Sequence, residues 1–441
     1  MLSVFQRRPA LVVLLAAWFM PLLLASVVEP MLERPVTLGT WFLIYSCIGA
    51  AVLGVCLNPP PVDSTLIPIP DRTVLYLAAF GGVCGLIYWY LTRNSGLSLE
   101  QTRQLLHAGD FAQTTLESYL FQVGGAVSFL SIVLSAQTSR PLLYLPAITG
   151  FSVACWIGLM LNTGGRIMAM EMVGMALCCG VVRYPRLVIS VRGVAVIVAL
   201  LIPLLALNIM FVQKRMETLF ADPAFADVMI SKSTSLLGNQ EGSLFSGDFI
   251  TTGTWMVLQF TSDPIFYLDY FRSLDFSNYH FGLYQFSLLA NRIPGYDWQE
   301  RRFELDALYE PLGIYWNVWG TVIRDATIDF SEFGAVLMFF AVGWLTGRMG
   351  LSRLPTGRLL HLFGILWLMF SPFLSIIPHR ALQVYLILAL GGHWILLRKS
   401  RALESRNRAR KPSREAPTPP PSRLLPGDDD GSSWPPLAKN P

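Results

Sequence analysis

The feature that most constrains this chain is a series of apolar runs, each long enough to cross a lipid bilayer as a helix. A helix needs about 20 predominantly apolar residues to span the hydrocarbon core. Only 14% of the 441 residues are charged, whereas about a quarter are charged in an ordinary soluble domain. We therefore predict an all-α fold, a polytopic membrane helical bundle. Its roughly ten spans are expected at 10–28, 38–57, 73–92, 119–138, 141–161, 166–182, 193–213, 333–349, 359–377 and 381–397.

Basic residues concentrate on one side of the predicted spans. With Arg7 and Arg8 placed in the cytoplasm, that side also receives most of the basic residues of the connections and the basic start of the tail, at Arg398. Cytoplasmic loops carry such an excess of arginine and lysine. The asymmetry predicts that both termini are cytoplasmic and that the segment before the last three spans is extracytoplasmic.

The spans divide the chain into four predicted parts. An N-terminal bundle of about seven helices covers 1–213, and a large extracytoplasmic loop covers 214–332. About three further helices cover 333–397, and 398–441 forms a cytoplasmic tail that is predicted to be disordered. The stretch 250–271 of the large loop is too apolar for a solvated loop. We therefore expect the large loop to contain short interfacial helices.

Arginines near the outer ends of the spans are the first candidates for a binding site. An ionised group close to hydrocarbon is costly and needs a compensating role. Arginine can hold phosphate oxygens with two hydrogen bonds, which favours an anionic, lipid-attached substrate. The alternative is interfacial snorkelling or ion pairing with acidic residues of the loop. The four candidates are Arg166, Arg272, Arg324 and Arg380.

Two aspartates accompany Arg324 at the start of a span. On a helix, we expect Arg324 and Asp325 to point in different directions, whereas Asp325 and Asp329 are four residues apart and share a face. Repulsion between like charges raises one pKa and can prepare a proton acceptor. The alternative is that one aspartate neutralises Arg324 while Asp329 caps the following helix.

His280 is a second candidate proton acceptor, because histidine titrates near neutral pH. The alternative is a hydrogen-bonded histidine without a catalytic role. Glu171 lies inside the sixth predicted span, and we expect its partner on another helix. Aromatic residues crowd the large loop, where they favour the head-group layer and can also stack on sugar rings.

Several nucleotide and metal motifs are absent from the sequence. It contains no Walker P-loop, no GxGxxG after a strand, no HExxH and no CxxC pair. We predict neither a metal site nor a cofactor, and nothing predicts nucleic-acid binding.

The segment "NVWGTVIRDATIDFSEFG" (317–334) resembles the O-antigen polymerase (Wzy-like) family, also described as oligosaccharide repeat unit polymerases. That family often shows an Asn-Val-Tyr-Thr-like start and then Asp-Phe-Gly-x-x-Gly entering a span. Trp319-Gly320 stand where the family has a single tyrosine, and Ser331 replaces the first glycine. The matching residues are Asn317, Val318, Thr321, Asp329, Phe330 and Gly334. "TGGRIMAMEM" with Gly165 and Arg166, and more weakly "GLYQFSLLANRIPG" (282–295), add to the resemblance.

The resemblance implies a GT-C-like, metal-independent membrane glycosyltransferase at the periplasmic face of the bacterial inner membrane. Its substrate would be an undecaprenyl-pyrophosphate-linked oligosaccharide, and its partners would include the bilayer, a chain-length regulator and a flippase. Arginines would neutralise the diphosphate leaving group, and Asp329, Asp325 or His280 would accept a proton. The expected substrate contacts are Arg324, Arg272, Arg166, Arg380, Tyr315, Trp316, Asn317 and Trp319.

Three alternatives remain at this point. An O-antigen ligase uses the same bond-forming chemistry with a lipid A-core acceptor. A flippase or exporter of lipid-linked glycans predicts charges along a central cavity, whereas the predicted charges gather at the outer ends of the spans. A non-catalytic scaffold would use the loop to bind protein.

Overall fold

The computed structural model describes residues 8–28, 35–60, 69–94, 116–163, 167–184, 263–308 and 321–410, apart from 275, 277–278, 291 and 353. The predicted span 193–213 lies outside these residues. So do the tail beyond 410 and the candidates Arg166, Tyr315, Trp316, Asn317 and Trp319. In the part that the structure describes, the chain forms helices and no strand, as the sequence predicts.

Most of the described helices overlap predicted apolar runs, but one begins at Val322, inside the predicted loop, and another continues to Arg410, into the tail that was predicted to be disordered. The helices are α2 (Pro9–Val28), α3 (Leu38–Cys56), α4 (Asp71–Asn94), α6 (Leu116–Tyr119), the π-helical turn η3 (Leu120–Gly124), α7 (Gly125–Ser135), α8 (Pro141–Thr163), α9 (Ile167–Arg183), α14 (Ser287–Ala290), α15 (Trp298–Ala307), α16 (Val322–Gly350), α17 (Pro355–Phe370) and α18 (Arg380–Arg410). Residues 263–273 are also helical.

Six of these helices, α2, α3, α4, α8, α16 and α18, are long and apolar enough to cross a membrane. The shorter runs Leu120–Ser135 and Pro355–Phe370 are also apolar, and α9 has 17 residues. The count of ten spans stays a prediction.

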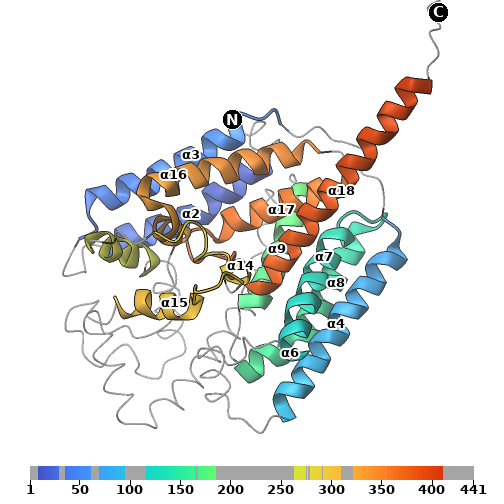
Figure 1. The fold of residues 1–441 in the computed structure, drawn as a ribbon, viewed down its shortest axis with the longest axis horizontal. Helices are drawn as coiled ribbons and strands as arrows, with labels where there is room; N and C mark the ends of the chain where they lie inside the picture. The colour runs from blue at the N-terminus through green and yellow to red at the C-terminus, as the bar shows by residue number, and fades with distance from the viewer. Residues whose placement is uncertain are drawn as a thin grey trace, which may run out of the picture. The chain divides into compact units, whose positions relative to one another are not determined.

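The first compact unit, Met1–His393, contains two groups of packed helices (Figure 1). In one group α3 packs along α16, and α2 and α17 complete it. In the other, α4 packs against α7, α8 and η3. Helix α9 contacts α7, α8 and α17, so it joins the two groups.

The second unit, Trp394–Pro441, is helical as far as Arg410 in its described part. Within it, the guanidinium of Arg398 lies 3.7 Å from the centre of the Trp394 ring.

Close contact between α3 and α16 depends on two glycines. A Cβ atom on Gly54 would meet the backbone of Phe340 and Gly343, and one on Gly343 would meet the backbone of Ala51. Small residues allow the backbones of two helices to approach closely when no hydrophobic effect drives them together. This packing holds α16, which carries most of the candidate residues.

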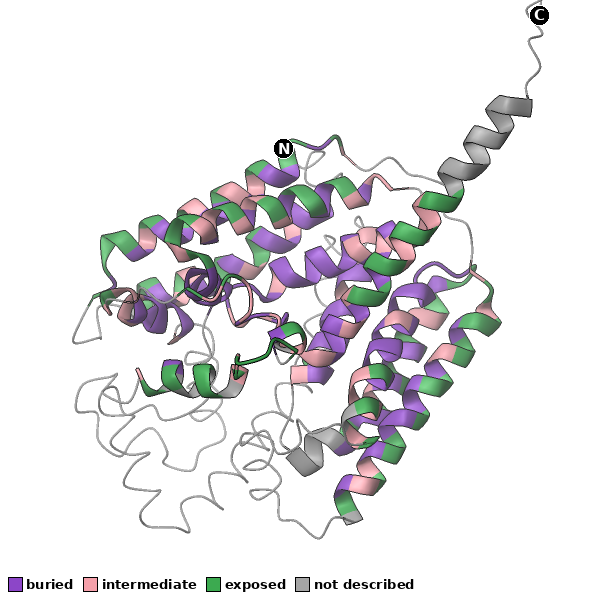
Figure 2. Cartoon of the chain, in the orientation of Figure 1, coloured by how far each residue is buried: buried purple, intermediate pink, exposed green. Residues whose placement is uncertain are grey.

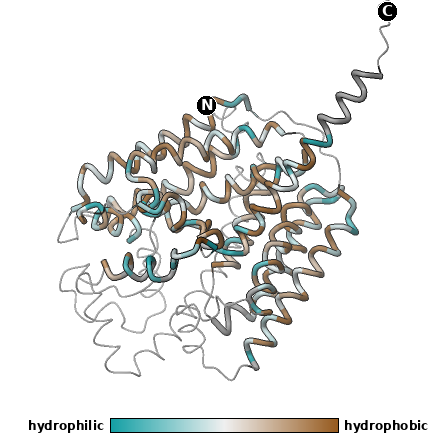
Figure 3. Tube along the Cα trace, viewed as in Figure 1, coloured by the Kyte–Doolittle hydropathy of each residue, from teal (hydrophilic) through white to brown (hydrophobic). Residues whose placement is uncertain are grey.

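The outward faces of the helices carry large apolar side chains. Phe19, Leu38, Phe42, Tyr76 and Phe333 are between 63% and 86% exposed. Figure 2 shows exposed residues along helices that are mostly brown, and thus hydrophobic, in Figure 3. Soluble proteins rarely expose so much contiguous apolar surface. Together with the length of the apolar helices, this surface indicates a membrane protein.

Candidate functional site

Helix α16 begins with a buried ion pair. The Thr321 side chain accepts a hydrogen bond from the backbone N–H of Arg324 and so caps the helix (3.2 Å). Both Nε and Nη2 of Arg324 donate to Oδ1 of Asp325, at 3.0 and 2.8 Å. The two residues are each only 5% exposed.

This pairing corrects one expectation from the sequence. Arg324 and Asp325 were expected to point in different directions because they are adjacent on a helix. The long arginine side chain instead folds back to its neighbour, and burial favours this contact because it compensates both charges. The alternative that an aspartate neutralises Arg324 is therefore confirmed.

Asp329 holds a turn that lies more than 40 residues earlier in the chain. Its Oδ1 and Oδ2 accept the backbone N–H groups of Tyr284 and Gln285, at 3.0 and 3.3 Å, and its side chain is fully buried. Its backbone carbonyl accepts a further hydrogen bond from Phe281 N–H (2.9 Å). The expectation that Asp329 caps the helix after it is therefore wrong, because both carboxylate oxygens serve the earlier turn.

The turn 280–285 is strained, which explains why it needs this support. Phe281 and Gly282 both have positive φ, 51° and 90°. A positive φ is costly for a residue with a side chain and persists only where the surroundings enforce it. The four hydrogen bonds to Ile328 and Asp329 supply that constraint.

A kink at Ser331 divides α16 directly after Asp329. Ser331 has φ 73° and ψ 174°, a backbone conformation used almost only by glycine. Gly334 follows three residues later, and a Cβ atom there would collide with Cβ of Phe330. The kink therefore separates the polar start of α16 from its long apolar part.

Arg272 joins the helical segment 263–273 to α3 and to the kink. Its Nε donates to Glu332 (2.6 Å) and its Nη1 donates to Thr40 (2.8 Å). Asp269, on the same segment, accepts hydrogen bonds from Thr37 and Thr40 at the start of α3. In the described part of the chain, Nη2 of Arg272 has no hydrogen-bond partner, and the side chain is 18% exposed.

His280 lies in an aromatic surrounding that keeps it neutral. Its Nδ1 is 2.9 Å from the hydroxyl of Tyr296, and the rings of Phe276 and Tyr284 lie beside it. Burial, reinforced by the positive charge of Arg301, lowers the pKa of His280 below its ordinary value. Burial, with the nearby Asp329 carboxylate, raises the pKa of Tyr296 to about 12. Both groups are therefore uncharged at neutral pH.

The connection 371–379 between α17 and α18 links this region to α18. The Ser375 hydroxyl donates to Oε1 of the buried Gln285 (3.2 Å), and Nε2 of Gln383 donates to the Gln285 carbonyl (3.1 Å). Gln383 also accepts the backbone N–H of Leu288 at 3.0 Å. Three segments far apart in the sequence are thus joined through Gln285.

The same connection carries a histidine that the sequence analysis did not select. Nδ1 of His379 lies 2.8 Å from Oε2 of Glu171, whose side chain is completely buried in α9. The partner of Glu171 was expected on another helix, but the structure places it on the connection that precedes α18. The signal in the sequence was the position of His379 beside Arg380 at the start of a predicted span.

Arg380 follows His379 and begins α18. It is half-buried, and no hydrogen bond or ion pair connects its guanidinium to another residue in the described ranges. It differs in this respect from Arg272 and Arg324, which have carboxylate partners.

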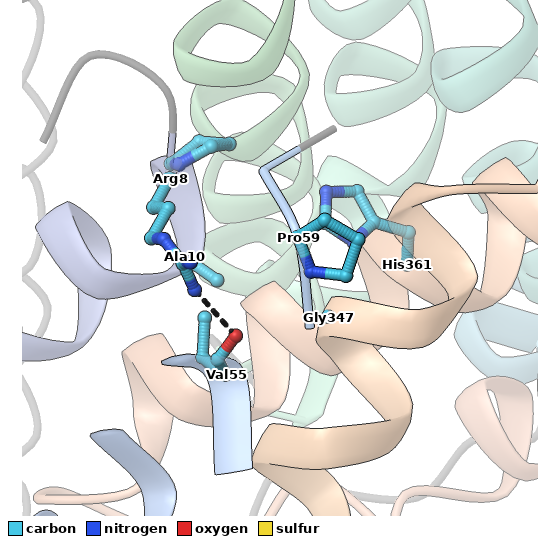
Figure 4. A pocket seen from close by; sticks show the side chains of 7 residues that line it. Arg8, Ala10, Val55, Pro59, Gly347 and His361 are labelled. Atoms are coloured by element: carbon cyan, nitrogen blue, oxygen red, sulfur yellow. Dashed lines mark hydrogen bonds between the residues drawn. The ribbon is translucent and has the colours of Figure 1, made fainter. Parts of the chain in front are cut away.

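A pocket lies at the other end of α16, far along the helix from Arg324. It is lined by Arg8, Pro9, Ala10, Val55, Pro59, Gly347 and His361 (Figure 4). Arg8 donates to the Val55 carbonyl across it (2.7 Å), and Nδ1 of His361 is 2.7 Å from the Thr346 carbonyl. None of the candidate residues lines this pocket. Among the described residues, no group of three or more His, Cys, Asp or Glu side chains could hold a metal ion.

Comparison with protein-family models, with curated protein sequences and with solved structures finds no match to this chain.

Proposed function

We propose that this chain is a membrane glycosyltransferase that joins lipid-linked oligosaccharide repeat units into O-antigen or exopolysaccharide. A growing glycan leaves its undecaprenyl diphosphate and is transferred to a hydroxyl of the next lipid-linked repeat unit. The asymmetry of arginine and lysine and the resemblance at 317–334 favour the periplasmic face of the inner membrane.

The convergence of polar groups on one half of α16 is the observation that carries this proposal. Segments 263–308 and 371–380 both reach the start of α16 or its kink through hydrogen bonds. The links are Arg272 to Glu332, Asp329 to Tyr284 and Gln285, and the backbone N–H of Val322 to the Ser371 carbonyl. A transport path across the bilayer would need polar groups along the spans, whereas these groups gather at one end of α16.

The backbone at Ser331 supports the resemblance to repeat unit polymerases. Ser331 stands where the family motif has its first glycine, and its φ of 73° is one that glycine adopts without strain. Gly334 stands at the second glycine of the motif, where a side chain would collide with Phe330. The local conformation is therefore one that the family's glycines would favour.

The arginines would neutralise the charge that develops on the diphosphate as it leaves, without a metal ion. Arg380 and Nη2 of Arg272 have no partner among the described residues, so both can donate to a phosphate oxygen. Arg166 stays a predicted third contact. Arg324 is buried and paired with Asp325, so we assign it to positioning the start of α16.

Surface glycans of cells that express variants test this proposal. Replacing the chromosomal copy by Arg380→Gln or Arg272→Gln should shorten surface glycans toward a single repeat. Arg301→Gln is the matched control, because Arg301 is 44% exposed and pairs with the exposed Glu304. Full-length glycans from both variants would contradict the assigned contacts.

The deletion strain separates the alternatives. The proposal predicts surface glycans with one repeat in cells that lack the protein. Unattached lipid-linked polymers would indicate a ligase, and lipid-linked repeat units confined to the cytoplasmic leaflet would indicate a flippase. Either outcome would contradict a polymerase.

A further inference from the structure

Glu171 and His379 form a carboxylate–imidazole pair that the proposed contacts do not use. Nδ1 of His379 lies 2.8 Å from Oε2 of Glu171, and the Glu171 side chain is fully buried. The contact is short but is not aligned as a hydrogen bond. The pair lies between α9 and the connection that precedes α18.

This arrangement fixes which nitrogen of His379 can accept a proton. An ionised carboxylate only accepts hydrogen bonds, so it favours the tautomer that carries hydrogen on Nδ1. Nε2 then presents its lone pair. In the described residues nothing is hydrogen-bonded to Nε2, and the His379 side chain is 19% exposed. A buried carboxylate behind an accessible imidazole is the arrangement of a general base.

Further contacts restrain His379 through its ring and through its backbone. The Phe121 ring meets it edge-on, with 5.3 Å between the ring centres and 84° between the planes. Phe121 belongs to the π-helical turn η3, and such turns occur frequently at functional sites. The backbone carbonyl of His379 accepts two N–H groups from the first turn of α18, both at 3.0 Å. Glu171 and Phe121 therefore contact the ring, and the first turn of α18 holds the backbone that carries it.

The Glu171–His379 pair contributes little to the stability of the fold. Oε1 of Glu171 has no hydrogen-bond partner within the described ranges although it is buried. A buried pair that is incompletely bonded stabilises a fold no better than apolar side chains of similar size. Its position beside Arg380, which has no partner among the described residues, points to chemistry rather than to packing.

We propose that His379 is the proton acceptor for the hydroxyl of the acceptor sugar, and that Glu171 is its positioning residue. This inference rests on the proposed glycosyl transfer. The acceptor oxygen forms a bond to the anomeric carbon of the donor glycan while its proton moves to Nε2 of His379. The bond between that carbon and the donor diphosphate breaks, and its electron pair leaves on the diphosphate. His379 then returns the proton to water.

Elongation of a synthetic lipid-diphosphate repeat unit by the full-length protein in vesicles tests this assignment. His379→Ala should reduce kcat about 100-fold or more with little change in KM, as expected for removal of a general base. Added imidazole should restore part of the rate. His393→Ala is the matched control, because Nδ1 of His393 is engaged by the Thr356 hydroxyl (3.1 Å), and it should stay within threefold of the wild type.

Whether the losses of kcat in the single variants add up in the double variant tests the role of Glu171. Glu171→Gln should lower kcat about 10-fold, and the double variant with His379→Ala should be no slower than His379→Ala alone, because the two groups act as a unit. Additive losses would contradict the positioning role. Thermal unfolding of each variant shows whether it is folded, and imidazole rescue requires a folded protein.

The elongation assay distinguishes a wrong assignment of His379 from a wrong proposed function. A wild-type protein that elongates no repeat unit overturns the proposed function. A wild type that elongates, with His379→Ala within threefold of it, overturns only the role of His379. Carbethoxylation in vesicles gives a readout without turnover, and His379 should react at least fivefold faster than the buried His361. Equal rates would contradict an accessible Nε2.

Discussion

Asp329 and Glu171 are both completely buried carboxylates, but the protein surrounds them differently. Both oxygens of Asp329 accept backbone N–H groups from the turn 284–285, so its charge is distributed over well-placed donors. Glu171 contacts a single imidazole, and its second oxygen has no partner within the described ranges. Asp329 therefore holds a strained turn in place, whereas Glu171 is proposed to position the His379 imidazole for taking up a proton. A buried carboxylate thus fixes the backbone at Asp329, and at Glu171 it supports the proposed reaction.

The largest expected effect comes from breaking the buried pair at the start of α16. Arg324→Met leaves the Asp325 charge buried without its arginine, which should lower the free energy of unfolding by about 3–5 kcal/mol. Arg272→Met is the matched control, because Glu332 is 48% exposed and the pair should contribute about 0–1 kcal/mol. Thermal or denaturant unfolding in detergent measures both. Equal losses would show that Arg324 and Asp325 are not buried together.

The two carboxylates can be compared directly through their amide replacements. Asp329→Asn places an NH₂ group against a backbone N–H and should cost about 1–3 kcal/mol of stability. Glu171→Gln keeps the size of a side chain whose oxygens lack hydrogen-bond partners, and it should change stability by less than about 1 kcal/mol in either direction. Unfolding of the two variants under the same conditions checks the difference. A larger loss of stability for Glu171→Gln than for Asp329→Asn would contradict the different roles of the two carboxylates.

Ser331→Gly should stabilise the protein by about 1 kcal/mol, because glycine relieves the strain of the positive φ. Ala335→Gly in the same helix is the control. It should destabilise by a similar amount, since glycine disfavours a helix and a buried methyl group is lost. A shift of the unfolding midpoint in the same direction for both variants would argue against strain at Ser331.

The smallest expected effect concerns pH. The pKa of His280 in the folded protein lies below its ordinary value of 6.5, so the unfolded chain binds the proton first as the pH falls. This contribution to stability is therefore complete above about pH 6.5 and is lost as the pH drops through the lower folded value. The charged groups that act on His280 are Arg301 and Glu304. His280→Gln should reduce the fall in Tm between pH 7 and pH 5 by about 1–3 °C. An unchanged fall would contradict a buried, neutral His280.

The sequence was sufficient to predict the apolar helices, because the length of an apolar run is a local property. It could not predict that Asp329 binds residues 284 and 285, since a contact over this distance depends on how the loop packs. The predicted direction of the Arg324 side chain was wrong. Helix geometry fixes the direction of the Cα–Cβ bond, whereas burial decides which partner the guanidinium reaches. Glu171 was expected to have a distant partner, but only packing identifies it as His379.

We propose that this chain extends lipid-linked glycans, and elongation by the purified protein tests that proposal. Vesicles that contain the wild-type protein and one synthetic undecaprenyl-diphosphate repeat unit should produce a ladder of products with two, three and more repeats. The same reaction without the protein gives the background. If the wild type leaves the repeat unit unchanged while it remains folded in the vesicles, the account is contradicted.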